Sequence, residues 1–342
     1  MTSISKYRSR VIADNVIAFS ISYQRENMLA RGMGLEHLRE LLIRLARPIL
    51  RQGASLAYGG HWNDTEDNFM FPLLRLISAE QEDNSLGGPD SSLQIGKLYN
   101  HSPWPGYLDV TPKIEAQWIN CCRVVRITQQ LAGFSNAEIV PDADANQVDP
   151  RTLFNKAITL SAMRRLMMEP MSIDIPDVPR AESIPPVTAR ILLGGKADSY
   201  SSFLPGIFEE ALATLQWGRP VYLLGGFGGA AEILAKAMLA AGNDRPRELT
   251  LDWHKERNPA LVTLLESARQ FAAPPGFAGM ENSLDALFEF VLRARADLSG
   301  TLKTALTDEQ TRELLQTSNI ANAVHLVRTG LVTSKNLPAL PA

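Results

Sequence analysis

Residues 189–232 read ARILLGGKADSYSSFLPGIFEEALATLQWGRPVYLLGGFGGAAE and decide the fold. Two short apolar runs, 189–193 and 220–224, each end in paired glycines. A segment of helical character follows each run, the first from Pro205 to Trp217 and the second over 230–241. Pro205 suits the first position of a helix, because its fixed φ is helical and it has no N–H to leave unpaired. This order predicts parallel strands joined by a right-handed helical crossover.

The first half of the chain has the same order. Residues 16–20 (VIAFS) and 54–58 (ASLAY) predict strands, and the second runs directly into Gly59-Gly60. Between them, apolar residues recur at helical spacing over 35–50, and a further helix is expected over 67–78. Pro48 should end or kink the first helix. The whole pattern predicts an α/β fold, a Rossmann-like parallel sheet flanked by helices.

The middle and the end of the chain are less regular, and we predict their elements from periodicity and breakers. The expectations are a polar loop at 80–92, a strand at 93–98, a loop at 101–107, a helix at 113–131, a loop at 134–150, a helix at 153–168, an extended segment at 176–186 and an edge strand at 249–252. The rest reads as helices near 258, at 283–296 and from Thr307, where Gln310 completes a capping box, ending near Gly330. This predicts a helical C-terminal extension.

Composition argues against several classes of protein. The chain has 34 basic and 37 acidic residues, which argues against a dedicated nucleic-acid binder. Its two cysteines, Cys121 and Cys122, are too few for a disulfide scaffold and favour a reducing compartment, and we expect both on a helix. The N-terminus lacks the apolar core of a signal peptide, and Glu232 and Lys236 interrupt the most apolar long stretch, 221–242. We therefore expect a cytoplasmic protein without a membrane span.

Paired glycines follow three of the predicted strands. They are Gly59-Gly60, Gly194-Gly195 and the run Gly225-Gly226-Phe227-Gly228-Gly229. In a parallel sheet these turns share one edge, where glycine lets the backbone approach a phosphate and the next helix offers its positive N-terminal end. One such turn would indicate only a tight bend, whereas three favour a nucleotide or sugar-phosphate ligand. Neither a G-x-x-x-x-G-K motif nor a G-x-G-x-x-G motif is present.

These motifs resemble those of the LOG-like superfamily, often called SLOG, which includes the LOG phosphoribohydrolases, the DprA-like proteins and the nucleotide-sensing domain of TRPM channels. The turn Tyr58-Gly59-Gly60 is similar to the Y-G-G turn of LOG enzymes, and residues 162–168 (AMRRLMM) are similar to their Arg-Lys-x-x-Met helix segment. Residues 193–196 (LGGK) and, after an insertion, 205–210 (PGIFEE) resemble their P-G-G-x-G-T-x-x-E element. The resemblance covers residues 12–242.

A second alignment places the P-G-G-x-G-T-x-x-E element on residues 225–232, with Gly229 in the place of Thr and Glu232 as the acid. We prefer the first alignment because it keeps the order of the following strand and helix. It makes 225–229 the next strand-end loop, whose glycine-rich form resembles SLOG branches found beside TIR-domain and other bacterial conflict systems. The resemblance implies defence signalling with an effector protein as partner. It also implies a homo-oligomer, since LOG-like proteins are often dimers.

The resemblance also implies chemistry. In LOG enzymes an arginine holds a phosphate by a bidentate fork, and a carboxylate stabilises an oxocarbenium-like ribose or activates water. Here Arg164 or Arg165 and Glu209 or Glu210 would fill these roles, as the catalytic residues if the protein is an enzyme. From the residues alone, the arginines could equally lie on a solvated helix face and the glutamates could be first-turn acids. The insertion before residue 205 favours binding over hydrolysis.

We therefore expect a site without metal for a nucleotide-derived ligand such as NAD or ADP-ribose. The ligand-binding candidates are Ser20, Ser22, Tyr58, Gly59, Gly60, His61, Gly194, Gly195, Lys196, Gly225, Gly226, Phe227, Gly228, Gly229 and Glu232. The five histidines show no metal-ligand spacing, and G-x-S-x-G is absent. The aromatic residues in or beside the predicted loops, on which a purine could stack, are Tyr58, Trp62, Trp104, Tyr107, Tyr200 and Phe227.

Two alternatives in other classes stay open, a nucleoside-monophosphate N-glycosidase and an interaction scaffold. The domain division expected is a SLOG-like nucleotide-binding domain over 10–255, with an inserted middle region over roughly 80–185, and a helical extension over 256–332. Apolar stripes in that extension suit either packing on the first domain or dimerisation.

Overall fold

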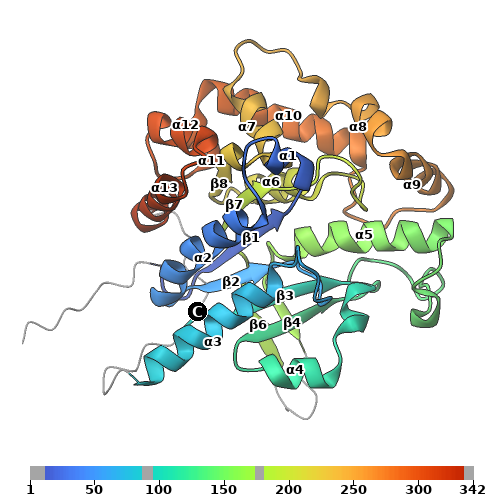
Figure 1. The fold of residues 1–342 in the computed structure, drawn as a ribbon. Helices are drawn as coiled ribbons and strands as arrows, with labels where there is room; N and C mark the ends of the chain where they lie inside the picture. Colours follow the sequence, from blue (N-terminus) through green and yellow to red (C-terminus); the bar gives the residue numbers. More distant parts are fainter. Residues whose placement is uncertain (1–11, 87–94, 174–180, 335–342) are drawn as a thin grey trace, which may run out of the picture.

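The computed structural model describes residues 12–86, 95–173 and 181–334. Its centre is a sheet of six parallel strands in the order β4-β3-β2-β1-β7-β8 (Figure 1). The strands are β1 (Val16–Ser22), β2 (Ser55–Tyr58), β3 (Leu98–Pro103), β4 (Cys122–Ile127), β7 (Ala189–Gly194) and β8 (Val221–Leu224). Helices flank the sheet, so the Rossmann-like α/β fold predicted from the strand, glycine and helix order is confirmed.

The direction in which the chain crosses the sheet reverses beside β1. From β1 the chain builds β2, β3 and β4 outward on one side, then returns past β1 to add β7 and β8 on the other. Ser22 at the end of β1 lies opposite Gly194 at the end of β7. In open α/β sheets ligands bind outside the carboxyl ends of the strands at such a switch point. Because all six strands are parallel, the three glycine turns lie at this same edge.

One face of the sheet is covered by α2 (Leu35–Arg51), α3 (Met70–Leu86), α12 (Asp308–Gln316) and α13 (Ile320–Thr333). The apolar stripe of α2 is buried against the strands. Pro48 does not end this helix as predicted: the helix runs on to Arg51, because Ile49 and Leu50 beyond the proline are buried in the core.

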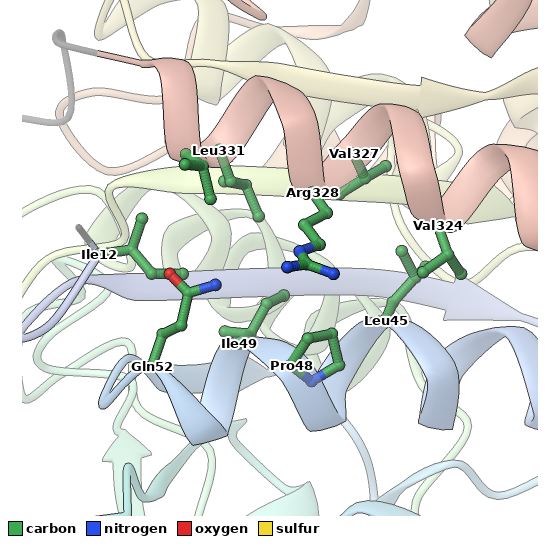
Figure 2. A pocket seen from close by; sticks show the side chains of 10 residues that line it. Ile12, Leu45, Pro48, Ile49, Gln52, Val324, Val327, Arg328 and Leu331 are labelled. Carbon is green, nitrogen blue, oxygen red and sulfur yellow. The ribbon is translucent and has the colours of Figure 1, made fainter. Parts of the chain in front are cut away.

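The C-terminal helix α13 lies along α2. Figure 2 shows Leu45 and Ile49 of α2 facing Val324 and Val327 of α13, with Leu331 at the end of the contact. The hollow left between the two helices measures about 10 Å³, which is room for no more than a water molecule. This contact is therefore packing, and it fixes α13 against α2.

The opposite face is covered by α5 (Pro150–Leu166), α6 (Gly206–Gln216) and α7 (Gly229–Leu239), against which α10 (Met280–Ala296) and α11 (Leu298–Leu302) pack. Figure 1 shows the C-terminal helices (orange to red) beside β7 and β8, away from β3 and β4. The predicted helical C-terminal extension is confirmed. The remaining α-helices and strands are α1 (Arg25–Leu29), α4 (Pro112–Trp118), the antiparallel pair of β5 (Met171–Ile173) and β6 (Glu182–Ile184), α8 (Leu251–Arg257) and α9 (Pro259–Gln270). None of the helices within the described ranges is both long and apolar enough to cross a membrane.

The segment predicted as one helix at 113–131 contains the fourth strand of the sheet. α4 ends at Trp118, and β4 pairs with β3 along its whole length. Its sequence CRVVRI places buried, β-branched valines between half-buried arginines, which suits a strand. Cys121 and Cys122 are both buried, and the expectation that they lie on a helix is wrong, because Cys122 opens β4. Burial raises the pKa of both thiols.

The polar stretch predicted as a loop at 80–92 is helical in its first part, because α3 continues to Leu86. Glu80 is 4% exposed, and its carboxylate accepts hydrogen bonds from Arg47 Nε at 2.9 Å and Arg51 Nε at 2.5 Å, both on α2. These ion pairs hold the polar end of α3 against α2. Residues 87–92 lie outside the described residues.

Smaller differences concern boundaries. β3 starts at Leu98 and takes in residues 101–103 of the predicted loop; residues 93–94 and 176–180 of two predicted segments lie outside the described residues. Pro205 is the N-cap of α6 and not its first residue. The edge strand at 249–252 is wrong, because Thr250 accepts a hydrogen bond from the Trp253 N–H and caps α8. The capping box of Thr307 with Gln310 is confirmed.

Candidate functional site

Arg164 and the tandem glutamates meet between α5 and α6. Arg164 comes from the last turn of α5, while Glu209 and Glu210 come from the start of α6. The Arg164 guanidinium forms a short ion pair with Glu209 and donates from Nη1 to the Ser202 hydroxyl at 3.0 Å. Gly206 leaves the space for it, since a Cβ there would lie 2.9 Å from Arg164 Nη2. The structure thus brings together an arginine and an acid that the first alignment pairs.

The two glutamates have different surroundings. The side chain of Glu209 is 17% exposed and lines a cavity. The carboxylate of Glu210 is turned toward the sheet, where its Oε1 lies 3.5 Å from Arg190 Nη1 and 4.0 Å from Arg164 Nε. Sequence reasoning could not separate these neighbours, whereas the structure places Glu209 toward the cavity and makes Glu210 the counter-ion of a buried arginine.

That buried arginine is Arg190, the second residue of β7, which has no exposed surface. Its other partners are Thr214 Oγ1 at 2.9 Å from Nε, Ser20 Oγ at 3.0 Å from Nη1, and the sulfurs of Met167 and Met168 at 3.8 Å from Nη2. Burial lowers its pKa, an effect that the charge of Glu210 opposes. Sequence reasoning missed Arg190, although a charge inside the apolar run ARILL is a usable signal because buried charges need partners.

The turn after β2 lies beside this cluster. A Cβ on Gly59 would lie 2.9 Å from the Cε atom of Met163, the residue before Arg164. The hydroxyl of Tyr58 donates to the Ile21 carbonyl at 3.4 Å, so this ring spans from β2 to β1. Burial raises the pKa of Tyr58, and the negative charge of Glu210 adds to this effect. The Tyr58-Gly59 turn is therefore next to the residues of α5 and α6.

His101 adds a neutral imidazole near the same turn. It is 2% exposed, and its Nδ1 has no hydrogen-bond partner within the described residues. Burial lowers the pKa of His101 to about 4; a hydrogen bond with the Tyr99 backbone raises it, and the positive charge of Arg190 lowers it further. His101 is therefore uncharged at neutral pH.

A cavity of about 140 Å³ opens beside the Arg164–Glu209 pair. Its floor is formed by α5 and α6, and its roof by residues 274–278 and the start of α10. Arg165 lines it, as does Trp217, whose surface is 47% exposed. Trp217 is not among the predicted aromatic candidates, because it ends a helix and those candidates lie in loops. Arginines, a carboxylate and an indole suit phosphate, sugar hydroxyls and a base.

The glycine turns after β7 and β8 pack on one another at the switch point. The Gly195 N–H donates to the Ser22 carbonyl at 3.1 Å, and the Ala230 N–H donates to the Gly195 carbonyl at 3.0 Å. A Cβ on Gly194 would lie 2.7 Å from the Ser22 carbonyl oxygen, and one on Gly229 would overlap the Gly195 carbonyl. These glycines permit close backbone packing between β1, β7 and α7.

Polar side chains from the β1–α2 connection reach across these turns. Arg31 forms an ion pair with Glu232 of α7, which also pairs with Lys236 at 2.9 Å. A Cβ on Gly228 would lie 3.0 Å from Arg31 Nε. An anion that entered here would compete with Glu232 for Arg31, close to the N-terminal end of α7.

Other predicted residues are placed in packing contacts or on the surface. A Cβ on Gly225 would lie 2.5 Å from the Leu315 carbonyl oxygen, and one on Gly226 would overlap the Thr317 backbone after α12. Buried aromatic candidates are Phe227, Trp62, Trp104 and Tyr200, while His61 and Lys196 are exposed. Substitution of Gly226 would therefore disturb packing as well as any ligand. Across the three described ranges, no group of three or more His, Cys, Asp or Glu side chains is placed to hold a metal ion.

The sequence matches the model of a known family. A family model described as SLOG cluster2 matches residues 11–314, which is most of the chain. No curated protein matches the sequence of the chain. The match reaches beyond the motifs of residues 12–242 and includes α10 and the roof of the cavity.

Proposed function

The chain belongs to the SLOG superfamily, a family of nucleotide-related binding or processing domains, and we propose that it binds a nucleotide-derived ligand of the NAD or ADP-ribose type between α5 and α6. The observation that carries this proposal is the Arg164–Glu209 pair. Its side chains are 9% and 17% exposed and stand at the wall of the 140 Å³ cavity. Burying an ion pair costs desolvation free energy that the attraction between the charges often does not repay. The position of this pair beside a cavity supports a role in binding a ligand.

Each group at the cavity has a part in the proposed binding. Arg164 and the half-exposed Arg165 both line the cavity, so their guanidinium groups can donate to phosphate oxygens. Glu209 can accept hydrogen bonds from ribose hydroxyls, and the exposed ring of Trp217 can stack on a base. An incoming phosphate would compete with Glu209 for Arg164.

Hydrolysis of a base–ribose bond is the second candidate, favoured by the Glu209 carboxylate at the cavity wall. Glycoside hydrolases, which pass through a similar oxocarbenium-like transition state, usually use two carboxyl groups that flank the scissile bond. Glu209 is engaged by Arg164, and the neighbouring Glu210 is turned away toward Arg190. This arrangement supports binding without turnover.

The proposal includes a role in bacterial defence signalling, with a homo-oligomer and an effector protein as partners. Its support is the resemblance of the loop Gly225-Gly226-Phe227-Gly228-Gly229 to conflict-system branches of the superfamily. A ligand at the α5–α6 site would then act as the signal.

Calorimetry with ADP-ribose, NAD and AMP tests the binding. Arg164→Gln should weaken the best of these ligands by about tenfold or more, because a hydrogen bond to a charged group contributes about 1.5–3 kcal/mol. Arg269→Gln, on the exposed side of α9, is the matched control and should leave affinity unchanged. The proposal would be refuted if the wild type bound none of the three ligands, or if Arg164→Gln bound the best of them as tightly as the wild type.

Chromatography of the same mixtures after long incubation separates the two candidates. Binding without turnover predicts that NAD, ADP-ribose and AMP stay intact. Release of nicotinamide or adenine by the wild type, lost in Glu209→Gln, would establish hydrolysis instead.

A further inference from the structure

Residues 272–279, between α9 and α10, lie over the Arg164–Glu209 pair, and five of them line the roof of the cavity. We propose that this segment, here named the cover, is a movable lid on the site and that the contact between Phe277 and Phe203 is its latch. That the cover controls ligand entry rests on the proposed function, whereas the opening of the cover is independent of it.

The size of the cavity favours such a movement. The cavity is partly open to solvent and measures about 140 Å³. A cavity of about 150 Å³ holds one molecule the size of benzene, whereas sites for ligands of drug size measure about 300–1,000 Å³. With the cover in place, the cavity therefore holds about one ring of a nucleotide, and the rest of the molecule lies outside it unless the cover moves.

The cover is held to its floor by apolar contacts. Within the described part of the chain, the hydrogen bonds of residues 272–279 stay inside the cover or go to the first turn of α10; examples are Phe277 N–H to Pro274 O and Asn282 Nδ2 to Ala278 O. The contacts that hold the cover include those of Phe277 with Phe203, whose ring centroids lie 4.6 Å apart, and with the apolar cluster around Phe154, and that of Pro274 beside Gly133. Since no backbone hydrogen bond to the floor has to break, opening costs little more than these contacts.

Two glycines flank the latch residue. Gly276 has a φ of +89° and Gly279, the N-cap of α10, has a φ of +76°. A Cβ at Gly279 would have no neighbour within 4 Å, so packing does not demand glycine there. Glycine at both positions lets the backbone change conformation around Phe277 at low cost, while Pro274-Pro275 keeps the segment before them stiff.

The latch is connected to the ion pair. Phe203 follows Ser202, whose hydroxyl accepts from Arg164 Nη1 at 3.0 Å and donates to the Leu204 carbonyl at 2.5 Å. Release of Phe277 removes one aromatic neighbour of Phe203, which also packs on Phe154, and a shift of Phe203 would move Ser202 away from Arg164. Opening of the cover would thereby expose the cavity and free an Arg164 N–H for a phosphate.

Thiol labelling of Ser161→Cys measures the opening. Ser161 lines the cavity floor with a buried hydroxyl, and the native cysteines are buried, so their labelling gives a slow background. In the full-length protein, Phe277→Ala should speed maleimide labelling of this cysteine by about tenfold, since it removes the ring that packs at a tilt against Phe203. Phe277→Leu, which keeps apolar volume, should give a smaller increase.

Phe290→Ala is the matched control, since Phe290 is a half-buried aromatic on α10 that packs in a different apolar cluster. It should leave the labelling rate within about twofold. The proposed lid movement would be refuted if Phe277→Ala left the labelling rate of Ser161→Cys unchanged, or if Phe290→Ala raised that rate as much as Phe277→Ala does.

Added ADP-ribose should slow labelling of Ser161→Cys if it binds beneath the cover. If the labelling rate responds to Phe277→Ala but to none of ADP-ribose, NAD and AMP, the lid movement is supported and the ligand site is not. A rate that responds to a ligand but not to Phe277→Ala would do the reverse.

Discussion

Glu210→Gln should destabilise the folded protein much more than Glu209→Gln, although the two residues are neighbours. Glu210 is the counter-ion of Arg190, which is fully buried, while Glu209 pairs with Arg164 at the wall of a cavity. Removing the charge of Glu210 leaves a guanidinium inside the protein without an opposite charge in contact with it.

The magnitude follows from the distance. Two unit charges 3.5 Å apart interact with about 5 kcal/mol at an effective dielectric constant of about 20. Glutamine is easier to bury than a carboxylate, and Arg190 keeps its bonds to Ser20 and Thr214. We therefore expect Glu210→Gln to lower the free energy of unfolding by about 3 kcal/mol, at the lower end of the cost of breaking a buried pair. Glu209→Gln should cost about 1 kcal/mol, because its surroundings are partly solvated.

Urea unfolding at neutral pH measures both values, with circular dichroism and tryptophan fluorescence recorded together to verify a single transition. Glu266→Gln, an exposed glutamate on α9, is the control for removal of a carboxylate and should change little. If Glu210→Gln were no less stable than Glu209→Gln, the division of roles between the two glutamates would be refuted.

Three further outcomes are expected. Acidification from about pH 7 to pH 5 should destabilise the protein through His101. The pKa of His101 is about 4 in the folded state and about 6.5 in the unfolded state, so the unfolded state binds more protons in this pH range. The free energy of unfolding should therefore fall by about 2 kcal/mol over this range. His101→Gln should reduce this loss in urea titrations at both pH values. Gly226→Ala should lower stability by about 2 kcal/mol in the same assay, because its Cβ would overlap the Thr317 backbone; an unchanged midpoint would contradict that packing. Thr307→Ala should cost about 1 kcal/mol by removing the cap that bonds the Gln310 N–H, and calorimetric melting would show it.

Local patterns sufficed for β1, β2, β7 and β8 of the sheet and for the glycine turns that follow three of them. A strand, paired glycines and a helix occur in short order around residues 58, 194 and 225, and each order is readable without distant contacts. Glu209 lies in the first turn of α6 and Arg164 in the last turn of α5, and it is the resemblance to LOG motifs that assigned both to one site.

Distant contacts explain what the sequence did not predict. β4 follows α4 with neither glycine nor proline to mark the boundary, and its pairing with β3 spans residues far apart in the chain. The polar end of α3 is helical because Glu80 meets Arg47 and Arg51 of another helix. The roof of the cavity lies more than a hundred residues after its floor on α5, so no local motif could connect them.

The cluster formed by Arg164, Arg190, Glu209 and Glu210 also bears on the interaction-scaffold alternative. Two positive and two negative charges lie largely buried against a central strand, where apolar residues of similar volume would be as stable or more stable. A chain that needed only a surface for other proteins would gain nothing from this arrangement, because the cluster is inside the molecule. Departures from the rule that cores are apolar are expected where a protein binds or reacts. The cost of this cluster, and the cavity beside it, therefore favour a ligand at this site over a purely structural role.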